Sequence, residues 1–525
     1  MFKKRGGKFI FAGYHMCVFN HIQSTVQGVF DMDKRIISLL LVLIMLAPSV
    51  VSCSESSVET SGGEVSDTSA DTENTVQDVL ETENRLECLV PDDMKLGGES
   101  VGILTSDVYP HGINVDEING DLLNDAMFEA NAKVMKDLEC TFDFIENGSS
   151  GNAKLVQAIT AGDEVYDIVY DRQWSLAPLV LRKFCANLNS SAGGYIDYEK
   201  PWWYSNYIDE TEVDETHTYL LAGEASPSVI LFSSMMILNT DMLVEQNIDV
   251  NDIYQTVLEG EWTHDEMSEL VAGQYRDKNG NGERDLDDIY GFSSPTRSDV
   301  EHFLIAAGVR GCSRDENGTP YVSINNETTY KFVEKLVEFL WQNDGSYYAE
   351  GLPIFDMLAN NQALLVSSKF GELEYLRESE SNYTVIPMPK LDTGIESYSS
   401  LVHDSALVIT IPMISSQVEE MTAVLEKLAY YYYYDVMPLY YETVLKVKYR
   451  RDSSEAAAQV IDIIHEGMTT DFAYIYNSDM NNIIHFFRDF IGVAKRTNYA
   501  AMYAKFGKMY DKGLNEVVRS IMGDD

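Results

Sequence analysis

The chain has 525 residues, and its 84 acidic side chains outnumber 38 basic ones, which gives a formal net charge of −46. Such a charge argues against nucleic acid and anionic lipid as partners, because both would be repelled. The length beyond the N-terminal leader fits two α/β domains rather than one core. The six cysteines show no CxxC pair and no metal-ligand spacing, so a disulfide is allowed but not implied.

An apolar block near the N-terminus has the composition of a secretory signal peptide. Residues 36–47 are almost entirely apolar, follow two basic residues, and lead through small residues to Cys53. The block is shorter than the ~20 residues of a membrane-spanning helix, which disfavours the alternative of a transmembrane anchor. We expect translation to begin at Met32, residues 1–31 to be a non-structural leader, and residues 32–52 to be the signal peptide.

The end of this signal, Val50-Val51-Ser52-Cys53, resembles a bacterial lipobox. In a lipobox the cysteine is acylated, for example with palmitate, and becomes the new N-terminus. The resemblance therefore implies a cell-membrane protein that faces outside the cell and touches the membrane through a lipid on Cys53 only. Residues 54–83 are rich in Ser, Thr and acidic residues and contain no Lys or Arg. Such a segment cannot bury enough apolar surface to offset its ordering entropy, so we expect residues 53–87 to form a disordered acidic tether.

Strand and helix patterns alternate along the rest of the chain. Apolar strands are predicted at 101–104, 166–170, 363–366, 383–387 and 405–412, and helices at 121–138, 153–160 and 417–434. Alternation of this kind predicts an α/β protein with a largely parallel sheet and helices on both faces. Ligands bind such sheets at the carboxyl ends of the strands.

Several short motifs follow the signal in a fixed order. They are Asn124-Asp125-Ala126-Met127, Gly162-Asp163 before a strand, Ile237-Leu238-Asn239-Thr240-Asp241, Glu261-Trp262-Thr263-His264, Tyr290-Gly291-Phe292 and Val385-Ile386-Pro387-Met388-Pro389. Their order resembles the extracellular solute-binding lipoproteins of ABC importers, of the carbohydrate, maltose-binding-protein-like type. The resemblance implies a two-lobe type II fold with a hinge, in a non-enzymatic monomer. Such a protein would close on a sugar or oligosaccharide and deliver it to ABC permease subunits.

The same resemblance projects limits for the two lobes. Lobe 1 would take residues 97–228 and 385–435. Lobe 2 would take residues 229–384 and 436–525.

One acidic loop, residues 277–288, has the spacing of an EF-hand calcium loop. Oxygen-bearing side chains and one backbone carbonyl fall at the ligand positions, in the order Asp277, Asn279, Asn281, Glu283 (carbonyl), Asp285 and Asp288. Asp288 is shorter than the usual Glu, and a strand pattern rather than a second helix follows it. The loop therefore predicts a half EF-hand that holds structural Ca²⁺, and repulsion among its carboxylates favours a cation. The alternative is a Gly/Asn turn without metal. No organic cofactor is expected.

Aromatic residues beside polar ones identify candidates for the solute site, because sugars present apolar faces to rings and hydroxyls to polar groups. Asp171, Arg172 and Trp174 directly follow a predicted strand, so Trp174 would stack on a ring while the other two form hydrogen bonds. The alternative is a surface Asp-Arg pair beside a core tryptophan. Further candidates, each with a structural role as its alternative, are Trp203, Glu224, Ser226, Glu372, Tyr375, His403 and Asp404.

Motifs of the common hydrolases and nucleotide-binding enzymes do not occur in the sequence. It contains no GxSxG elbow, no HExxH helix and no P-loop. Two alternatives to a transport protein stay open. One is a surface lipoprotein that binds glycans without serving an importer, and the other is an exported glycoside hydrolase, whose paired carboxylates are hard to see in a sequence.

Overall fold

The computed structural model describes residues 85–106, 112–148, 152–189, 194–214, 216–377, 379–440 and 454–523. These residues belong to one compact unit, Asn84–Asp525. The predicted signal peptide, Cys53 and most of the predicted tether lie outside the described residues. Within the described part of the chain, every helix is too short or too polar to cross a membrane.

Lobe 1 is built on a four-stranded sheet with the strand order β12-β3-β1-β2. The strands are β1 (Ser100–Thr105), β2 (Thr141–Glu146), β3 (Ile168–Arg172) and β12 (Leu407–Thr410). β1 pairs in parallel with β2 and β3, whereas β12 runs antiparallel to β3. The helices are α4 (Leu122–Leu138), α5 (Ala153–Ala161), α6 (Gln173–Leu181), α7 (Ser205–Thr211), α15 (Val418–Tyr431), the π-helical turn η4 (Tyr432–Val436) and α16 (Met437–Tyr440).

Local sequence explains the limits of α4. The side chain of Asp121 accepts hydrogen bonds from the backbone N–H groups of Leu123 and Asn124, which satisfies donors that the first helical turn leaves free. Its buried residues recur at helical spacing and include Met127 and Val134, which are fully buried. The prediction of a helix at 121–138 is confirmed.

Lobe 2 is built on a five-stranded sheet with the strand order β10-β4-β9-β5-β8. The strands are β4 (Ser234–Asn239), β5 (Tyr290–Ser294), β8 (Ser346–Tyr348), β9 (Ala363–Lys369) and β10 (Tyr383–Ile386). The surrounding elements are α9 (Thr240–Glu245), α10 (Val250–Leu258), α11 (His264–Val271), α12 (Asp299–Ala306), α13 (Glu327–Trp341), α14 (Ile354–Ala359), the 3-10 helix η3 (Phe370–Leu376) and the hairpin of β6 (Cys312–Arg314) and β7 (Pro320–Val322).

The chain passes from one sheet to the other more than once. A short helix, α8 (Pro227–Leu231), leads from lobe 1 into β4. The return from β10 to β12 runs through β11 (Ser400–Leu401), which pairs in parallel with β13 (Met468–Thr469). β4 pairs antiparallel with β9 and β10, whereas β5 pairs in parallel with β8 and β9, so the sheet of lobe 2 is mixed. In lobe 1 the expected parallel pairing holds for β1, β2 and β3, and only β12 is antiparallel. The antiparallel pairs involve strands next to a crossing, where the chain enters a sheet from the opposite direction.

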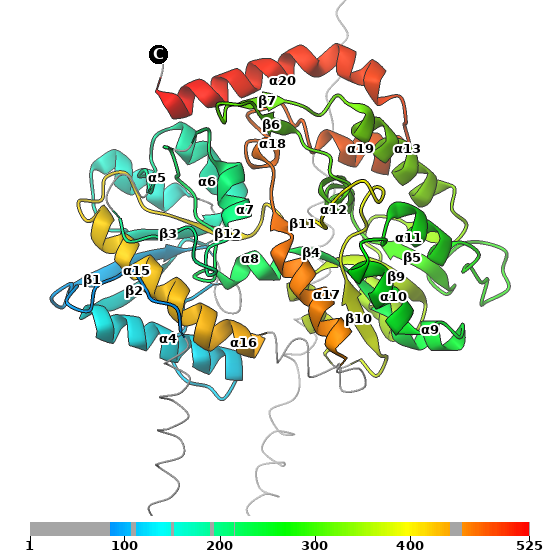
Figure 1. Ribbon diagram of the computed structural model, residues 1–525, viewed down its shortest axis with the longest axis horizontal. Coiled ribbons are helices and arrows are strands. Elements are labelled where there is room, and N and C mark those ends of the chain that lie inside the picture. Colours follow the sequence, from blue (N-terminus) through cyan, green and yellow to red (C-terminus); the bar gives the residue numbers. More distant parts are fainter. Residues whose placement is uncertain are drawn as a thin grey trace, which may run out of the picture. The chain divides into compact units, whose positions relative to one another are not determined.

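The C-terminal part of the chain packs on both lobes. It consists of α17 (Glu455–Glu466), α18 (Phe472–Ile475), α19 (Phe486–Gly492) and α20 (Tyr499–Met522). α20 contacts α6 of lobe 1 and also α13 and β7 of lobe 2, while α19 packs on α12 and α13. Figure 1 shows the two sheets in separate halves, with α8 and β11 between them and α20 running along one edge. The projected residue limits of the lobes stay a prediction.

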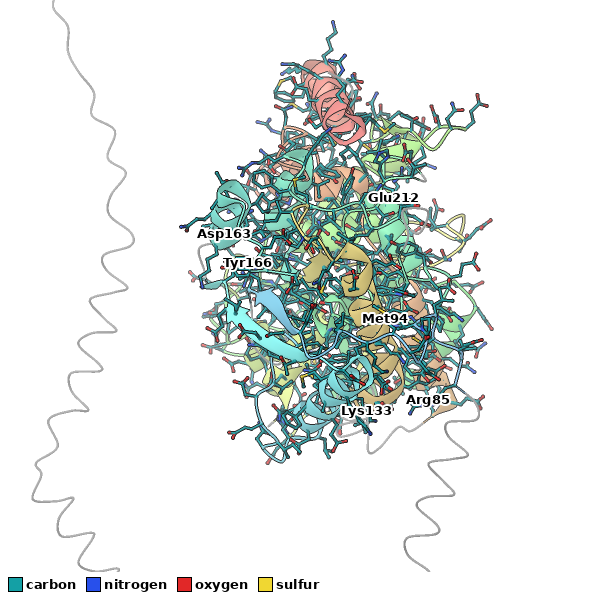
Figure 2. The ribbon with its side chains drawn as sticks, turned by 90° about the vertical axis from the view of Figure 1, so that its left-hand side faces the viewer. Arg85, Met94, Lys133, Asp163, Tyr166 and Glu212 are labelled. Carbon is teal, nitrogen blue, oxygen red and sulfur yellow. The ribbon has the colours of Figure 1, made fainter. Side chains whose placement is uncertain are left out.

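Aromatic side chains fill the outer part of lobe 1. The indole N–H groups of Trp202 and Trp203 donate to the carboxylate of Glu426 on α15, at 3.1 and 2.7 Å. On the same lobe, Arg85 and Lys133 both pair with Asp435, at 2.5 and 2.9 Å (Figure 2).

The four cysteines of the described residues, Cys88, Cys140, Cys185 and Cys312, are free thiols.

Candidate functional site

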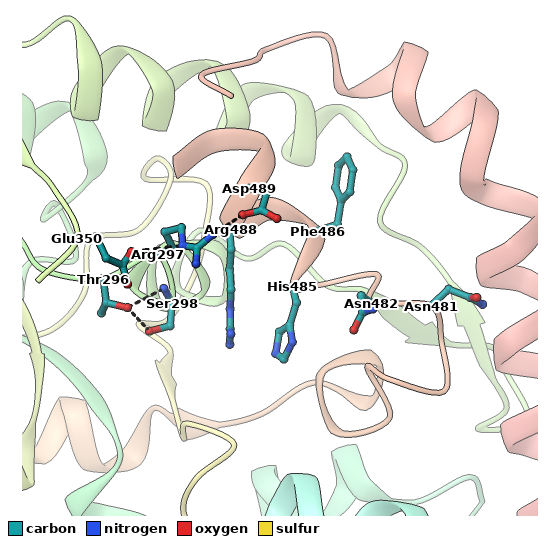
Figure 3. Close-up of a pocket in the computed structure, with 10 residues that line it drawn as sticks. All are labelled: Thr296, Arg297, Ser298, Glu350, Asn481, Asn482, His485, Phe486, Arg488 and Asp489. Atoms are coloured by element: carbon teal, nitrogen blue, oxygen red, sulfur yellow. Dashed lines mark hydrogen bonds and ion pairs between the residues drawn. The ribbon is translucent and has the colours of Figure 1, made fainter. Parts of the chain in front are cut away.

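A cavity of about 540 Å³ opens beside the segment that follows β5 and the start of α19. Its walls include Arg297 and Ser298 from the segment after β5, Asn482 from the turn before α19, and His485 and Arg488 (Figure 3). The cavity therefore combines residues after a strand of lobe 2 with residues of the C-terminal segment. Its lining is mostly polar, which suits a hydrophilic solute.

A buried carboxylate behind this cavity holds two of its walls. Glu301 on α12 is fully buried and binds Arg488 through both oxygens, with Oε2 accepting from Nη2 at 2.7 Å and Oε1 accepting from Nε. His485 Nε2 lies 3.7 Å from Glu301 Oε1 and 3.6 Å from Asp404 Oδ2. This network joins α12, the segment before β12, and α19.

The network shifts the acidity of its members. Burial raises the pKa of Glu301, although the hydrogen bond from Arg488 opposes that rise. For Arg488, burial favours the neutral form, but the hydrogen bond and charge of Glu301 outweigh it and raise the pKa. Burial also opposes ionisation of Asp404, yet His485, His403 and Arg488 together lower its pKa. Arg488 and Asp404 are therefore charged at neutral pH.

A second polar group lies next to this network. His403 Nδ1 is 3.1 Å from Asp404 Oδ1, and burial lowers the pKa of His403 to about 4, so the ring is neutral at pH 7. Its ring faces His302, with ring centroids 6.2 Å apart. Lys369, at the end of β9, pairs with Glu372 at 2.8 Å. Each charged group here has an opposite charge or a hydrogen-bond partner.

On the lobe 1 side, one carboxylate joins the ends of the three parallel strands. Asp171 is fully buried and accepts hydrogen bonds from Ser106 after β1 (2.5 Å), Asn147 after β2 (3.4 Å) and Ser175 on α6 (2.9 Å). The backbone N–H of Arg172 also donates to it, at 2.7 Å. Its geometry is that of a positioning group for the loops that follow the strands.

The structure brings three predicted ligand residues together. The backbone N–H of Trp174 donates to the carbonyl of Asp404 at 3.3 Å, and the side chain of Trp174 is 50% exposed. His403 is the immediate neighbour of Asp404. Arg172 is half-buried at the end of β3, and Glu372 faces the same polar group through Lys369. Their role as solute contacts stays a prediction.

The other predicted ligand residues lie elsewhere. Trp203 is buried against Glu426, and Ser226 donates to the carbonyl of Leu407 at 2.7 Å. The buried carboxylate of Glu224 lies 3.5 Å from His465 Nε2. Tyr375 is 72% exposed and packs on Phe355, with ring centroids 5.0 Å apart. These contacts show what each side chain touches, and a ligand role for them also stays a prediction.

Sequence reasoning missed the residues that line the cavity. Arg488 and Glu301 are 187 positions apart, and nothing in either local sequence announces their pairing. The turn before α19 carried a usable signal, because Asn481 and Asn482 both adopt positive φ, 58° and 60°, and asparagine is enriched there. A turn at an Asn-Asn pair near a predicted helix start marks a candidate binding loop.

The predicted calcium loop is closed by hydrogen bonds within itself. Asp277 accepts from the N–H groups of Gly280 (2.6 Å) and Gly282 (2.8 Å), and the Asn279 and Asn281 amides donate to Asp285. The Tyr275 hydroxyl lies between the Glu283 carbonyl (3.2 Å) and Asp288 Oδ2 (3.1 Å). Among the described residues, no group of three or more His, Cys, Asp or Glu side chains is placed to hold a metal ion. A cation here would need amide and carbonyl oxygens as well as carboxylates.

Comparison with known proteins identifies the fold. No protein-family model matches the sequence, and no curated protein does. Among solved structures, UgpB from Mycobacterium tuberculosis in complex with glycerophosphocholine matches 74% of this chain and 95% of its own, with 11% identity and a TM-score of 0.50. The chain has the two-lobe, periplasmic-binding-protein-like fold.

Two further structures with this fold cover the full length of their own chains. They are the maltose/maltodextrin-binding domain MalE from Bdellovibrio bacteriovorus bound to maltotriose (14% identity, 80% of this chain, TM-score 0.49) and an ABC transporter solute-binding protein from Thermotoga lettingae bound with α-D-tagatose (12%, 80%, 0.48). The likeness to UgpB and the two sheets in separate lobes confirm the two-lobe α/β expectation from the sequence.

Proposed function

We propose that this protein is an extracellular solute-binding protein that captures a sugar or oligosaccharide between its lobes and delivers it to an ABC permease. The observation that carries the proposal is the two-lobe fold, in which the polar cavity of lobe 2 is linked to lobe 1 through Asp404: His485 lies 3.6 Å from its carboxylate, and the backbone N–H of Trp174 donates to its carbonyl. A solute that touches both lobes stabilises the closed arrangement over the open one. The permease would then recognise the closed form.

The charge pattern of the cavity supports an uncharged polyhydroxyl solute. Arg297 pairs with Glu350 and Asp489, at 3.3 and 2.7 Å, and Arg488 pairs with Glu301. Cations that are already neutralised offer directed hydrogen bonds but little net attraction for an anion. The half-exposed indole of Trp174 lies outside the lining of this cavity, next to Asp404, and is the face on which we expect a sugar ring to stack.

A thermal-shift screen of the purified chain against neutral oligosaccharides, acidic sugars and peptides tests the proposal. A solute at a hundred times its Kd stabilises the native state by about 2.7 kcal/mol, which is a readily measured shift in Tm. Trp174→Ala should weaken sugar binding about tenfold through loss of stacking, with little change in the Tm of the free protein. Peptides that shift the Tm while no sugar does would exclude the carbohydrate assignment.

Membrane attachment through Cys53 is part of the same proposal. A diacylglyceryl group supplies two chains, which suffice for stable anchoring, and the tether keeps the receptor near its permease at high local concentration. Cys53→Ala should release the protein from the membrane fraction of cells, whereas retention there would contradict acylation. Two permease genes beside this gene would favour transport over a glycan-binding role without an importer.

A calcium ion in the loop 277–288 is proposed separately. The residues that would hold it are Asp277, Asn279, Asn281, Glu283 through its carbonyl, Asp285 and Asp288. Their oxygen donors are of the type that Ca²⁺ prefers, and bound calcium would replace hydrogen bonds that now join the side chains of the loop. Calcium should raise the Tm of the wild type and leave that of Asp285→Ala unchanged. An identical melting curve in calcium and in chelator would contradict the site.

A further inference from the structure

We infer that Arg488, neutralised and oriented by the buried carboxylate of Glu301, is the residue that makes the cavity select uncharged solutes over anionic ones. The inference rests on the proposed sugar-binding function and assigns the selectivity to one buried pair.

The geometry of the pair leaves part of the guanidinium for the solute. Glu301 takes the Nε and Nη2 edge of Arg488, and among the described residues none accepts a hydrogen bond from Nη1. The Arg488 side chain is 27% exposed, whereas Glu301 is fully buried. Figure 3 shows Arg488 and His485 extending side by side from the start of α19. Arg488 therefore presents N–H donors to the cavity from a position that its partner fixes.

The burial of the partner decides what these donors recognise. An exposed arginine attracts any anion, because salt and water screen the charge of the carboxylate with which it pairs. Glu301 has no access to water, so its full negative charge stays within hydrogen-bond distance of the guanidinium. A neutral hydroxyl can accept from Nη1 without disturbing this pair. A carboxylate or phosphate at the same place would meet the field of Glu301 and repulsion from Asp404, which lies beyond His485.

Arg297, the other arginine of the cavity, differs from Arg488 in that its acidic partners are exposed to water. Its side chain is 48% exposed, and its partners Glu350 and Asp489 are 63% and 74% exposed. Water weakens such pairs, so they contribute little to selectivity. The discriminating charge is therefore the one behind the cavity wall rather than those at its mouth.

The test compares matched neutral and acidic oligosaccharides on four forms of the chain. The probes are maltotriose and the triglucuronate with the same α-1,4 linkages, which differ only at C6. In the wild type the neutral probe should bind more tightly. Glu301→Gln removes the neutralising charge but keeps the shape of the side chain. The ratio of the affinity for the acidic probe to that for the neutral probe should therefore rise about tenfold or more. That gain should weaken as salt is raised. Glu301→Gln/Arg488→Gln removes both charges and should restore the preference for the neutral probe.

Asp265→Asn serves as the matched control, because it also removes a carboxylate from a cation, Lys335, at an exposed pair outside the cavity. It should leave the ratio unchanged. A wild type that binds neutral sugar, with an unchanged ratio in Glu301→Gln, would overturn this inference alone. If Glu301→Gln does not fold, Glu301→Gln/Arg488→Gln decides, because it buries no unpaired charge: an unchanged affinity for the neutral probe would overturn the inference. A wild type that binds neither sugar would overturn the proposed function, and this inference with it.

Discussion

Glu301 on α12 and Glu426 on α15 are both fully buried glutamates, but their partners differ in kind. Glu426 accepts two indole N–H groups, which are neutral donors, and burial raises its pKa to about 7 despite them. Glu301 faces the guanidinium of Arg488, which neutralises its charge inside the protein. Two glutamates with the same burial therefore differ in charge: the carboxylate beside a guanidinium forms an ion pair at a cavity wall, whereas the one beside two neutral donors forms a pH-sensitive contact.

The largest expected effect comes from removing the cation beside Glu301. Arg488→Met leaves a buried carboxylate without its partner, which costs about 3–5 kcal/mol of unfolding free energy at pH 7. Urea unfolding measures this, and Glu301→Gln/Arg488→Met should recover most of the loss because no charge is then buried. A loss below about 1 kcal/mol would show that the pair is solvated in solution.

The second prediction concerns the pH dependence that Glu426 confers. Its pKa is raised from 4.5 to about 7 in the folded state, so between these values the folded chain binds more protons than the unfolded chain. Stability from this group is therefore complete below about pH 4.5 and falls by about 3 kcal/mol as pH rises to 7 and above. Glu426→Gln mimics the protonated carboxyl, so it should be about as stable as the wild type at pH 5 and more stable by about 3 kcal/mol at pH 8. Parallel curves in urea unfolding across this range would contradict the assignment.

His403, beside the Glu301 network, should act in the opposite direction. Its pKa falls from 6.5 to about 4 on folding, so the unfolded chain binds more protons in that window. Stability is lost as pH drops from 6.5 to 4, by about 2 kcal/mol after a discount for its partial exposure. His403→Gln should flatten this part of the profile. A wild-type profile that the substitution leaves unchanged would show that the ring is solvated.

The smallest effect is expected at an exposed pair. Lys335 and Asp265 lie 2.7 Å apart, but Asp265 is 69% exposed. Asp265→Asn should change the unfolding free energy by only about 0–1 kcal/mol, and less in high salt. A larger loss would mean that the short distance between the charges outweighs their exposure to water.

Much of the fold could be predicted from the sequence, because strand and helix patterns are local. The predicted strand at 101–104 corresponds to β1, and the helix at 417–434 begins as α15 before its last turns become the π-helical η4. Trp174, Asp404 and His403 could be named as candidates for the same reason, since they lie directly beside predicted strands.

The residues that line the cavity could not be predicted from the sequence, because their positions depend on contacts between distant segments. In the sequence, nothing distinguishes Arg488 from other residues of a helix. The packing of α19 on α12 places it beside Glu301. Trp203 could likewise be assigned to the solute site or to the core, and only the pairing with Glu426, 223 positions away, shows what it touches. The antiparallel pairs of β4 and β12 could not be predicted, because the direction of these strands follows from the crossings between the lobes.

Asp171 gives lobe 1 a property that matters before any solute arrives. By accepting hydrogen bonds from Ser106, Asn147 and Ser175, it ties the ends of β1, β2 and β3 to the start of α6. Ser106, Asn147 and the first turn of α6 are therefore held in place relative to β3, at the edge of the sheet where its three parallel strands end. If a solute contacts these residues, the entropy of ordering them has already been lost on folding, so their part of the cost of binding is small.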